Sequence, residues 1–404
     1  MRISIPSIPS SSSSRAQVDY TLVQATDLLA DFLRNGKGKT MLMTGAGVSV
    51  DSGIAPYRGE HGHYTIHKTY RPIFYPEFVD PSPKGHAFRQ RYWSRSFLGF
   101  KPVQFASPNP THYSIAALQR MGYIPEFITQ NVDNLHHAAT PSPSLAAQSI
   151  LELHGSLQNI VCVSSPTEGS LRERPNDPIV HARLSASHLV GPRKRASPVP
   201  HNTPTGEAYP NGCGFRGSRT AFQDLLEQTN PMWDDFAKEM RAKKTEPKTN
   251  PDGDVDLGNN VDYSTFKYPP CPSCGGVLKP AVIFFGESVP PLLRDRSYDL
   301  ISNASSLLLV GTSLATYSAF RLVKHAIELG KPVGILNIGP TRADGIVEAA
   351  GGWKIDGVGS SQVLKAVGEK LASERGSGDL VTQRLLSSGV IKPLERRGRG
   401  VVSS

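Results

Sequence analysis

The chain has 404 residues, of which 38% are hydrophobic and 20% charged, so it has enough apolar material for a large buried core. The formal net charge of +9 favours an anionic partner, but no basic run is interleaved with aromatic residues, so we expect no nucleic-acid groove. No apolar run approaches the about 20 residues that a membrane span needs. Four cysteines in so long a chain exclude a disulfide scaffold and favour a reducing compartment.

Both ends of the chain are polar. The segment 1–18 contains Arg2 and Arg15, many serines and no acidic residue. This composition is typical of a mitochondrial transit peptide, and a plain disordered tail has it too. We expect 376–404 to be a flexible tail, whose arginines lie among glycines.

Between the ends, predicted strands and helices alternate. Asn109-Pro110 is a helix start, and Gly36, Gly122 and Gly330 are positioned to end helices. The expected elements in chain order are a helix over 22–33, a strand over 40–44, a helix over 110–121, strands over 126–129, 150–153, 282–285 and 306–310, a helix ending near 329, and a strand over 333–338. This alternation predicts an α/β fold with a doubly wound, parallel, Rossmann-like sheet.

The alternation stops between residues 156 and 278, which hold all four cysteines. We expect this stretch to be a smaller module inserted in a sheet domain formed by 19–155 and 279–375. Within the module, residues 164–211 are rich in Pro and Ser. Such a segment cannot bury enough apolar surface to offset its ordering entropy, so we predict that it is disordered.

Polar side chains follow two of the predicted strands. Gln130, Asn131 and Asp133 come after one strand, and His154 follows the next. Parallel α/β sheets bind ligands at the carboxyl ends of their strands, where the amide and carboxylate groups could bind ribose hydroxyls or an amide. His154 is the candidate general base, because an ordinary imidazole has a pKa of about 6.5.

A glycine-rich turn over 44–53 follows the strand over 40–44. Such a turn exposes backbone N–H groups to a phosphate, although a simple tight turn is the alternative. Gly45 and Gly47 fit the dinucleotide fingerprint, but Val50 replaces its third glycine, and no acidic residue ends a strand about 20 residues later. This disfavours a hydride-transfer dehydrogenase. Arg58 lies soon after the turn and could bind a phosphate bidentately.

Two further turns of small or polar residues follow predicted strands, over 311–313 and 337–339. Three such turns fit one extended ligand across the sheet edge, such as a dinucleotide. Cys271 and Cys274 have the spacing of half a zinc site. The other half should lie upstream, where only Cys162 stands in place.

Together these motifs resemble the sirtuins, a family of NAD-dependent protein deacylases. The resemblance covers residues 20–375 apart from the 164–211 segment. The matching motifs are GAGVSVDSG over 45–53, TQNVD over 129–133, His154-Gly155, the Cys271/Cys274 pair, KPAVIFFG over 279–286, GTS over 311–313 and NIG over 337–339. Three more stretches, over 91–97, 251–255 and 335–342, are similar to the class II branch, whose animal members are mitochondrial.

The resemblance implies the roles of individual residues. His154 and Asn131 would be catalytic, and His154 would accept a proton from a ribose hydroxyl after nicotinamide leaves. NAD would be bound by Gly45, Ala46, Gly47, Ser49, Tyr57, Arg58, Gln130, Asn131, Asp133, Gly311, Thr312, Ser313, Asn337, Ile338 and Gly339. The acyl-lysine substrate would pair as an added strand with the segment of Val282, Phe284, Phe285 and Gly286. Zinc would be held by Cys162, Cys213, Cys271 and Cys274.

Two departures from the family pattern stand out. The family usually has Pro-Asp before the aromatic-Arg pair, whereas this chain has Ala55-Pro56, which removes a carboxylate from the nicotinamide side. The second Cys-x-x-Cys pair is interrupted, and joining residue 163 to 212 would restore it. We hypothesise that 164–211 is an inserted sequence, such as a retained intron, and that Cys213 is reached across a loop. Long loops cost little extra closure entropy, about 0.6 kcal/mol per doubling, so zinc binding is compatible with the insertion.

The leading hypothesis is an NAD-dependent protein-lysine deacylase that transfers the acyl group to ADP-ribose. Protein mono-ADP-ribosylation is the first alternative, because it needs the same NAD contacts. A non-catalytic NAD-binding scaffold is the second, if the split zinc site fails to fold. The sequence does not identify the acyl group, the protein substrates or the oligomeric state.

Overall fold

The computed structural model describes residues 20–59, 62–66, 71–164, 212–243, 249–255, 257, 261–376 and 379–392. The predicted transit peptide over 1–18 lies outside these residues, and so does the predicted insertion over 164–211 apart from its first residue. None of the described helices is both long enough and apolar enough to cross a membrane.

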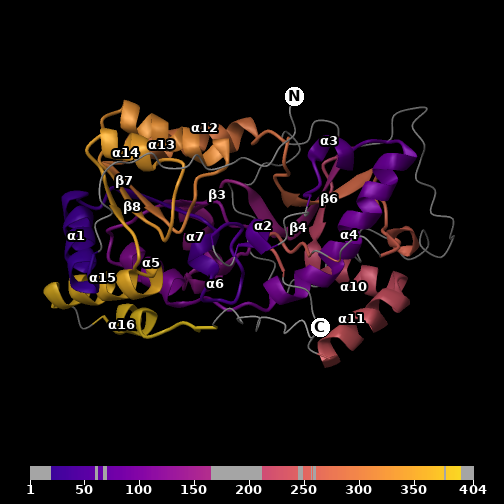
Figure 1. Cartoon of the computed structure of the whole chain (residues 1–404), viewed down its shortest axis with the longest axis horizontal. Coiled ribbons are helices and arrows are strands. Elements are labelled where there is room, and N and C mark those ends of the chain that lie inside the picture. Colours follow the sequence, from indigo (N-terminus) through magenta and orange to yellow (C-terminus); the bar gives the residue numbers. More distant parts are fainter. Residues whose placement is uncertain are drawn as a thin grey trace, which may run out of the picture.

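A parallel six-stranded sheet with strand order β3-β2-β1-β7-β8-β9 lies at the centre of the larger domain. Figure 1 shows this domain beside the smaller module. The central strands of the sheet are fully buried because helices cover both faces, which explains their uninterrupted apolar sequences. The strands are β1 (Thr40–Thr44), β2 (Phe127–Thr129), β3 (Ile150–Glu152), β7 (Ser306–Val310), β8 (Val333–Leu336) and β9 (Trp353–Ile355). This architecture confirms the predicted doubly wound fold.

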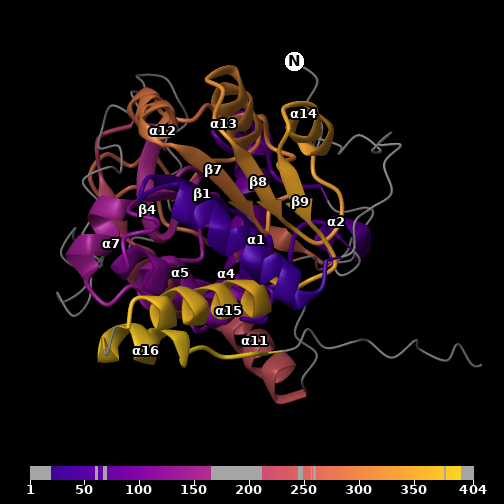
Figure 2. The ribbon, with the colours of Figure 1, turned by 90° about the vertical axis from the view of Figure 1, so that its left-hand side faces the viewer.

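Alternate side chains of β1 enter two separate cores. Leu42 packs with one layer of helices, whereas Met41 and Met43 pack with the other. Figure 2 shows the sheet between these layers. The first layer contains α1 (Leu22–Asn35), α5 (Pro110–Arg120), α7 (Pro143–Ser149) and α15 (Ser360–Glu374), and the second contains α12 (Pro291–Asn303), α13 (Tyr317–Glu328) and α14 (Asp344–Ala349).

Local sequence signals set the ends of these helices. Thr21 and Gln24 form a reciprocal capping box at the start of α1, and Gly36 follows its last residue. Asn109 caps α5, whose first residue is Pro110. The predicted starts and stops of these two helices are therefore confirmed.

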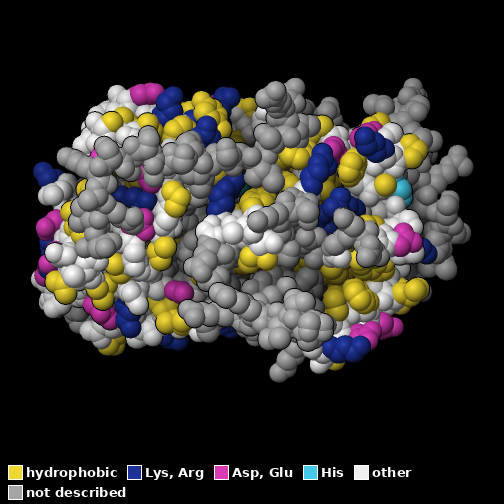
Figure 3. Space-filling view, viewed as in Figure 1, with side chains coloured by type: hydrophobic (Ala, Val, Ile, Leu, Met, Phe, Trp, Pro, Cys, Tyr) yellow, Lys and Arg dark blue, Asp and Glu magenta, His cyan; other side chains and the backbone are white. Residues whose placement is uncertain are grey.

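The smaller module contains an antiparallel sheet of order β5-β4-β6, formed by β5 (Arg216–Ser218), β4 (Gly155–Ser164) and β6 (Val277–Val282). Helices α10 (Arg219–Thr229) and α11 (Pro231–Lys243) follow β5. The remaining short elements are η1 (Ala46–Ser49), α2 (His63–Ile66), α3 (Tyr75–Phe78), α6 (Leu135–Ala139) and η3 (Tyr263–Thr265). On the face in Figure 3, Lys and Arg side chains of described residues form separate patches among acidic and apolar ones.

The packing corrects three predictions. Helix α4 (Pro83–Gln104) was expected in the sheet domain, but its Trp93 and Phe97 share a core with Phe222 and Cys271 of the small module. The predicted strand over 282–285 does not form. The strand in this region is β6, which pairs with β4 and ends at Val282.

The third correction concerns the predicted flexible tail over 376–404. Helix α16 (Leu380–Leu386) packs on α5 and α15, with Leu385 and Leu386 buried against Ala116 and Ala117. The chain then runs back along α5. Val390 N–H donates to the Pro108 carbonyl at 3.1 Å, and Lys392 N–H donates to the Asp51 carbonyl at 2.7 Å. We call residues 387–392 the C-terminal strap.

Candidate active site

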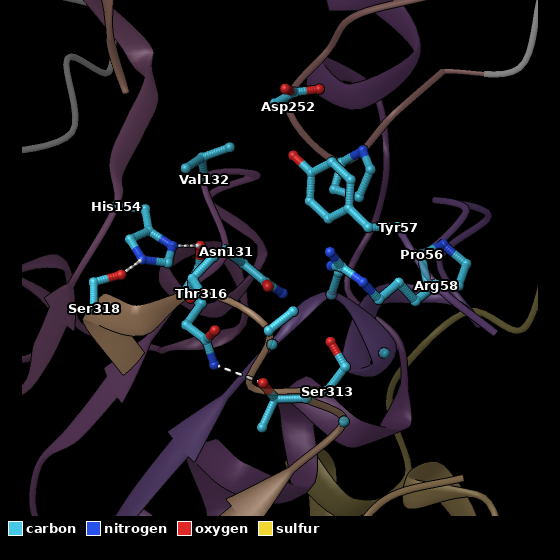
Figure 4. A pocket seen from close by; sticks show the side chains of 18 of the residues that line it. Pro56, Tyr57, Arg58, Asn131, Val132, His154, Asp252, Ser313, Thr316 and Ser318 are labelled. Atoms are coloured by element: carbon cyan, nitrogen blue, oxygen red, sulfur yellow. Dashed lines mark hydrogen bonds between the residues drawn. The ribbon is translucent and has the colours of Figure 1, made fainter. Parts of the chain in front are cut away.

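A cavity of about 1060 Å³ lies at the carboxyl ends of the parallel strands. The strand order reverses between β1 and β7, which is where open α/β sheets place their ligands. The small module contributes part of the cavity wall through the segment after β6 and the loop that contains Asp252 (Figure 4). One cavity therefore borders both parts of the molecule.

The glycine turns after β1 and β7 are in direct contact. Gly47 N–H donates to the Gly311 carbonyl at 2.8 Å. A Cβ atom on Gly47 would lie 2.8 Å from the same oxygen, and one on Gly45 would lie 2.7 Å from the Thr312 Cβ, so both glycines are needed for this approach. Gly45, Ala46 and Gly47 line the cavity, as do the turns 311–313 and 337–339. All three predicted turns therefore reach one cavity.

Amide side chains after β2 are held toward this cavity. Gln130 Nε2 donates to Thr312 Oγ1 at 2.8 Å and to the Thr44 carbonyl at 3.2 Å. Asn131 Nδ2 donates to Ser49 Oγ at 3.1 Å. Gln130 and Asn131 both line the cavity, which brings these predicted residues together with the glycine turns.

Ser49 and Asp133 are buried behind the cavity and are not among the residues that line it. Ser49 Oγ donates to Asp133 Oδ2 at 2.7 Å, and Asp133 Oδ1 accepts from Leu135 N–H at 3.0 Å. Burial raises the pKa of Asp133, while these two hydrogen bonds oppose the shift. Both residues were predicted to contact NAD. This contact stays a prediction, and in the structure Ser49 joins Asp133 to Asn131 through its hydroxyl.

His154 follows β3 and lines the cavity. Its carbonyl accepts from Ile283 N–H at 2.8 Å, which joins it to the end of β6. Nδ1 lies 3.3 Å from the Gln130 carbonyl and Nε2 lies 2.8 Å from Ser318 Oγ. Burial lowers the pKa of His154 to about 4, so its imidazole is neutral near pH 7 and can accept a proton.

Tyr57 and Arg58 border the cavity on the side opposite His154 (Figure 4). Tyr57 stacks on Tyr64 with ring centroids 5.7 Å apart, and the Arg58 guanidinium lies 5.3 Å from the Tyr64 ring. Burial lowers the pKa of Arg58, although an arginine stays charged near neutral pH. Figure 4 shows the guanidinium directed into the cavity toward Asn131, where an anionic ligand would meet it.

The segment after β6 is extended and forms one wall of the cavity. Tyr75 N–H donates to the Phe285 carbonyl at 2.9 Å, and Phe284 N–H donates to Glu287 Oε2 at 2.7 Å. Glu287 also pairs with the buried Lys279, whose Nζ lies at 3.1 Å. The predicted substrate residues Val282, Phe284, Phe285 and Gly286 all line the cavity. Val282 does so as the last residue of β6, and the other three follow the strand.

The four cysteines converge in the small module, and all four Sγ atoms lie within 4.8 Å of one another. The Cys162–Cys274 and Cys213–Cys271 sulfur pairs are 3.6 and 3.5 Å apart. A tetrahedral zinc with bonds of about 2.3 Å needs sulfur atoms about 3.8 Å apart, so this donor set fits zinc. A closed set of four thiolates is a structural site, since it leaves no open position for substrate. Cys213 joins the cluster despite the interrupted motif.

Several cavity residues lie outside the predicted set. They include Tyr64, Tyr92, Asp252, Thr316, Ser318 and Arg321. Asp252 belongs to the 251–255 stretch, and Ser318 comes shortly after the 311–313 turn. Both residues therefore lie in or near motifs that the sequence analysis identified. Which side chains near those motifs face the cavity depends on backbone turns that spacing does not predict.

Comparisons with known proteins agree with this geometry. A model of the Sir2 family matches residues 45–190 and 224–318, more than half of the chain. This chain belongs to the Sir2 family. Among its Sir2 relatives, an NAD-dependent protein deacylase SIR4 of Batrachochytrium dendrobatidis is 40% identical over 87% of this chain and 95% of its own length. An NAD-dependent protein deacetylase of Xanthomonas axonopodis pv. citri is 36% identical over 80% of this chain and 87% of its own length.

Solved Sir2 structures show the same fold. A Sir2 variant with a deacetylated p53 peptide and 3'-O-acetyl ADP ribose has a TM-score of 0.53 at 22% identity, covering 85% of this chain and 98% of its own. A second structure, described as a basis for the mechanism and regulation of Sir2 enzymes, has a TM-score of 0.51 at 24% identity, covering 87% and 99%.

Proposed function

We propose that this Sir2-family protein is an NAD-dependent protein-lysine deacylase, which releases nicotinamide and transfers the acyl group to ADP-ribose. The observation that carries the proposal is the single cavity that brings together the paired glycine turns, the neutral His154 imidazole and the segment after β6. The names of the Batrachochytrium and Xanthomonas relatives support the same activity.

NAD supplies an ADP-ribosyl group that is activated by its nicotinamide leaving group. The glycine turns let a ligand approach the backbone at the end of β1 without side chains in between, and Arg58 offers a cation, so together they suit the pyrophosphate. Gln130 and Asn131 are fixed by their own hydrogen bonds and can therefore orient ribose hydroxyls without large loss of side-chain entropy.

The acyl-lysine would enter along the segment after β6. Its peptide backbone would add to this extended segment by β-augmentation, and the apolar side chains of Phe284 and Val132 would exclude water around the acyl group. His154 would take the proton of the attacking ribose hydroxyl at Nε2, which the neutral imidazole leaves available as an acceptor.

A nicotinamide-release assay tests the proposal. We expect the full chain with zinc to release nicotinamide from NAD in the presence of an acyl-lysine peptide, and His154→Ala to lose about 10²- to 10⁴-fold in rate. Release without acyl peptide, with label transferred to protein, would support ADP-ribosylation instead. No release at all would support a scaffold.

We further propose a class II type of enzyme that acts in mitochondria. The support is the motif similarity over 91–97, 251–255 and 335–342, together with the composition of residues 1–18. Fractionation of cells that express the full chain tests the location, and absence from mitochondria would contradict it. A panel of acetyl, lipoyl, branched and dicarboxylic acyl peptides identifies the acyl group.

A further inference from the structure

Ser318 contacts the imidazole of His154 from a distant part of the chain. It is the second residue of α13, and its Oγ lies 2.8 Å from Nε2 of His154. Ser318 also lines the cavity, and Figure 4 shows it beside the imidazole on the side away from Arg58. Helix α13 therefore carries a hydroxyl to the nitrogen that the proposed mechanism uses.

The partner of the other ring nitrogen, Nδ1, determines which group donates in the contact between His154 and Ser318. Nδ1 of His154 lies 3.3 Å from the Gln130 carbonyl, which is only an acceptor, so Nδ1 carries the proton in the neutral ring. Nε2 then has the lone pair, and the Ser318 hydroxyl donates to it. The same hydroxyl can rotate and accept a hydrogen bond once Nε2 has gained a proton.

The hydrogen bond between Ser318 and the neutral His154 ring differs in strength from the one between Ser318 and the protonated ring. A bond from a charged imidazolium is roughly twice as strong as one between neutral groups. The Ser318 hydroxyl therefore stabilises the protonated ring more than the neutral ring, and it opposes the effect of burial on His154. It also fixes the ring's orientation, because both nitrogens are then bonded.

We propose that Ser318 is a positioning residue for the base, which holds the neutral His154 ring before proton transfer and stabilises the imidazolium afterwards. This inference rests on the proposed role of His154. The arriving ribose hydroxyl would take the place of Ser318 as the donor to Nε2. Its O–H bond breaks as the N–H bond forms, its oxygen bonds to the carbon of the imidate that formed when nicotinamide left, and the electron pair of the C=N bond passes to the lysine nitrogen. Once the ribose oxygen has left Nε2, the imidazolium N–H donates to Ser318 Oγ. Ser318 keeps its own proton throughout.

Other ionisable groups line the same cavity as His154. Those on the cavity wall are Asp51 after η1, Tyr57, Arg58 and Tyr64 near α2, Tyr92 of α4, Asp252 and Asp254 of the 249–255 loop, Glu287 after β6, Arg294 of α12, and Tyr317 and Arg321 of α13. Each of them stays in place when Ser318 is replaced. A difference between variants therefore reports the hydroxyl.

The test compares Ser318→Ala, which removes the hydroxyl, with Ser318→Thr, which keeps it. Ser302→Ala is the matched control, because Ser302 Oγ lies 3.0 Å from Nε2 of His325 in a similar pair remote from the cavity. We expect Ser318→Ala to lower kcat about fivefold and to move the acid limb of kcat/KM to lower pH by about half a unit to one unit. Ser318→Thr and Ser302→Ala should match the parent chain.

A second readout needs no turnover. Histidine-labelled full chain is titrated by NMR without NAD or peptide, and the His154 signal is assigned by its loss in His154→Gln. The His154 pKa should fall in Ser318→Ala and stay unchanged in Ser302→Ala. An unchanged or raised His154 pKa in Ser318→Ala would overturn the inference, even in an active enzyme. Lack of acyl-dependent nicotinamide release by the parent chain would count against the proposed function alone.

Discussion

Burial disfavours protonation of two histidines at and behind the cavity. Burial lowers the pKa of His112 to about 3 and that of His154 to about 4, both far below the ordinary value of about 6.5. His112 lies on α5, with Nε2 3.4 Å from Ser49 Oγ, so it belongs to the hydrogen-bond network behind the cavity. Protonating such a residue requires it to leave its neutral, buried environment.

The direction of the pH effect follows from proton counts. Between pH 6.5 and 4 the unfolded chain binds protons at these histidines and the folded chain does not, so the free energy of unfolding falls as the pH falls. Each histidine contributes a slope of up to about 1.4 kcal/mol per pH unit. Urea unfolding at several pH values gives the free energy of unfolding as a function of pH. This free energy should change less steeply with pH in His112→Asn than in the parent chain. Equal slopes would contradict this assignment.

A buried ion pair joins α4 to the 249–255 loop. Arg95 Nε donates to Asp254 Oδ1 at 2.7 Å, and the two side chains are only 1% and 4% exposed. Arg95→Met removes the guanidinium partner of the buried Asp254 carboxylate, so we expect it to cost about 3–5 kcal/mol of unfolding free energy, and Arg95→Met with Asp254→Leu to cost less. Arg34→Met, which removes a surface pair with Glu374, should cost under about 1 kcal/mol. Denaturant unfolding of the three variants and the parent chain measures these differences.

Sequence motifs predicted the identities of site residues better than their contacts. The residues predicted to bind NAD or substrate line one cavity except Ser49 and Asp133, which face each other behind it. A motif records which side chains are present near a strand end, but the direction of each depends on turns such as the one at Asn134, whose φ is 65°. Ser318 escapes prediction for the same reason, since its partner is His154 in a distant segment.

At the scale of elements, local signals were sufficient where a helix cap or a buried apolar run decided the structure. They failed where tertiary pairing decided it. Val282 ends β6 because β4 is its partner up to that point, and no property of the 282–285 sequence reveals that partner. Helix α16 has only seven residues, too few to be stable alone, and it forms because α5 and α15 cover its apolar face.

The C-terminal strap contacts the glycine-rich turn over 44–53. Lys392 N–H donates to the carbonyl of Asp51, and Asp51 lines the cavity. A chain that ends after Leu386 should therefore bind NAD about fivefold more weakly than one that ends after Lys392, since it loses the hydrogen bonds from Val390 to Pro108 and from Lys392 to Asp51. Titration calorimetry with NAD measures the difference.

Substitutions at one position separate the strap's backbone from its side chain. Lys392→Pro removes the N–H donor, whereas Lys392→Ala keeps it. We expect only the proline variant to weaken NAD binding. If the alanine variant weakens it equally, the lysine side chain is responsible and the backbone explanation is wrong.

At the scale of the whole molecule, the cysteine cluster decides whether the small module folds. We expect the purified chain to bind zinc in about equimolar amount, and Cys213→Ser to lose zinc and lower the Tm as strongly as Cys162→Ser does. Ser273→Ala is the control, because Ser273 is exposed between two ligands and should leave both properties unchanged. Zinc retention by Cys213→Ser would show that the interrupted motif does not supply the fourth ligand.

The antiparallel sheet of the small module is formed by strands from both sides of the 165–211 stretch. β4 ends at Ser164, and its partners β5 and β6 both come after the 165–211 stretch. The peptide bonds of that stretch are therefore not what keeps the two halves of the module together. A protease site engineered there should yield two fragments that separate on a denaturing gel yet elute as one species in native buffer. Separately expressed fragments should then restore activity by complementation.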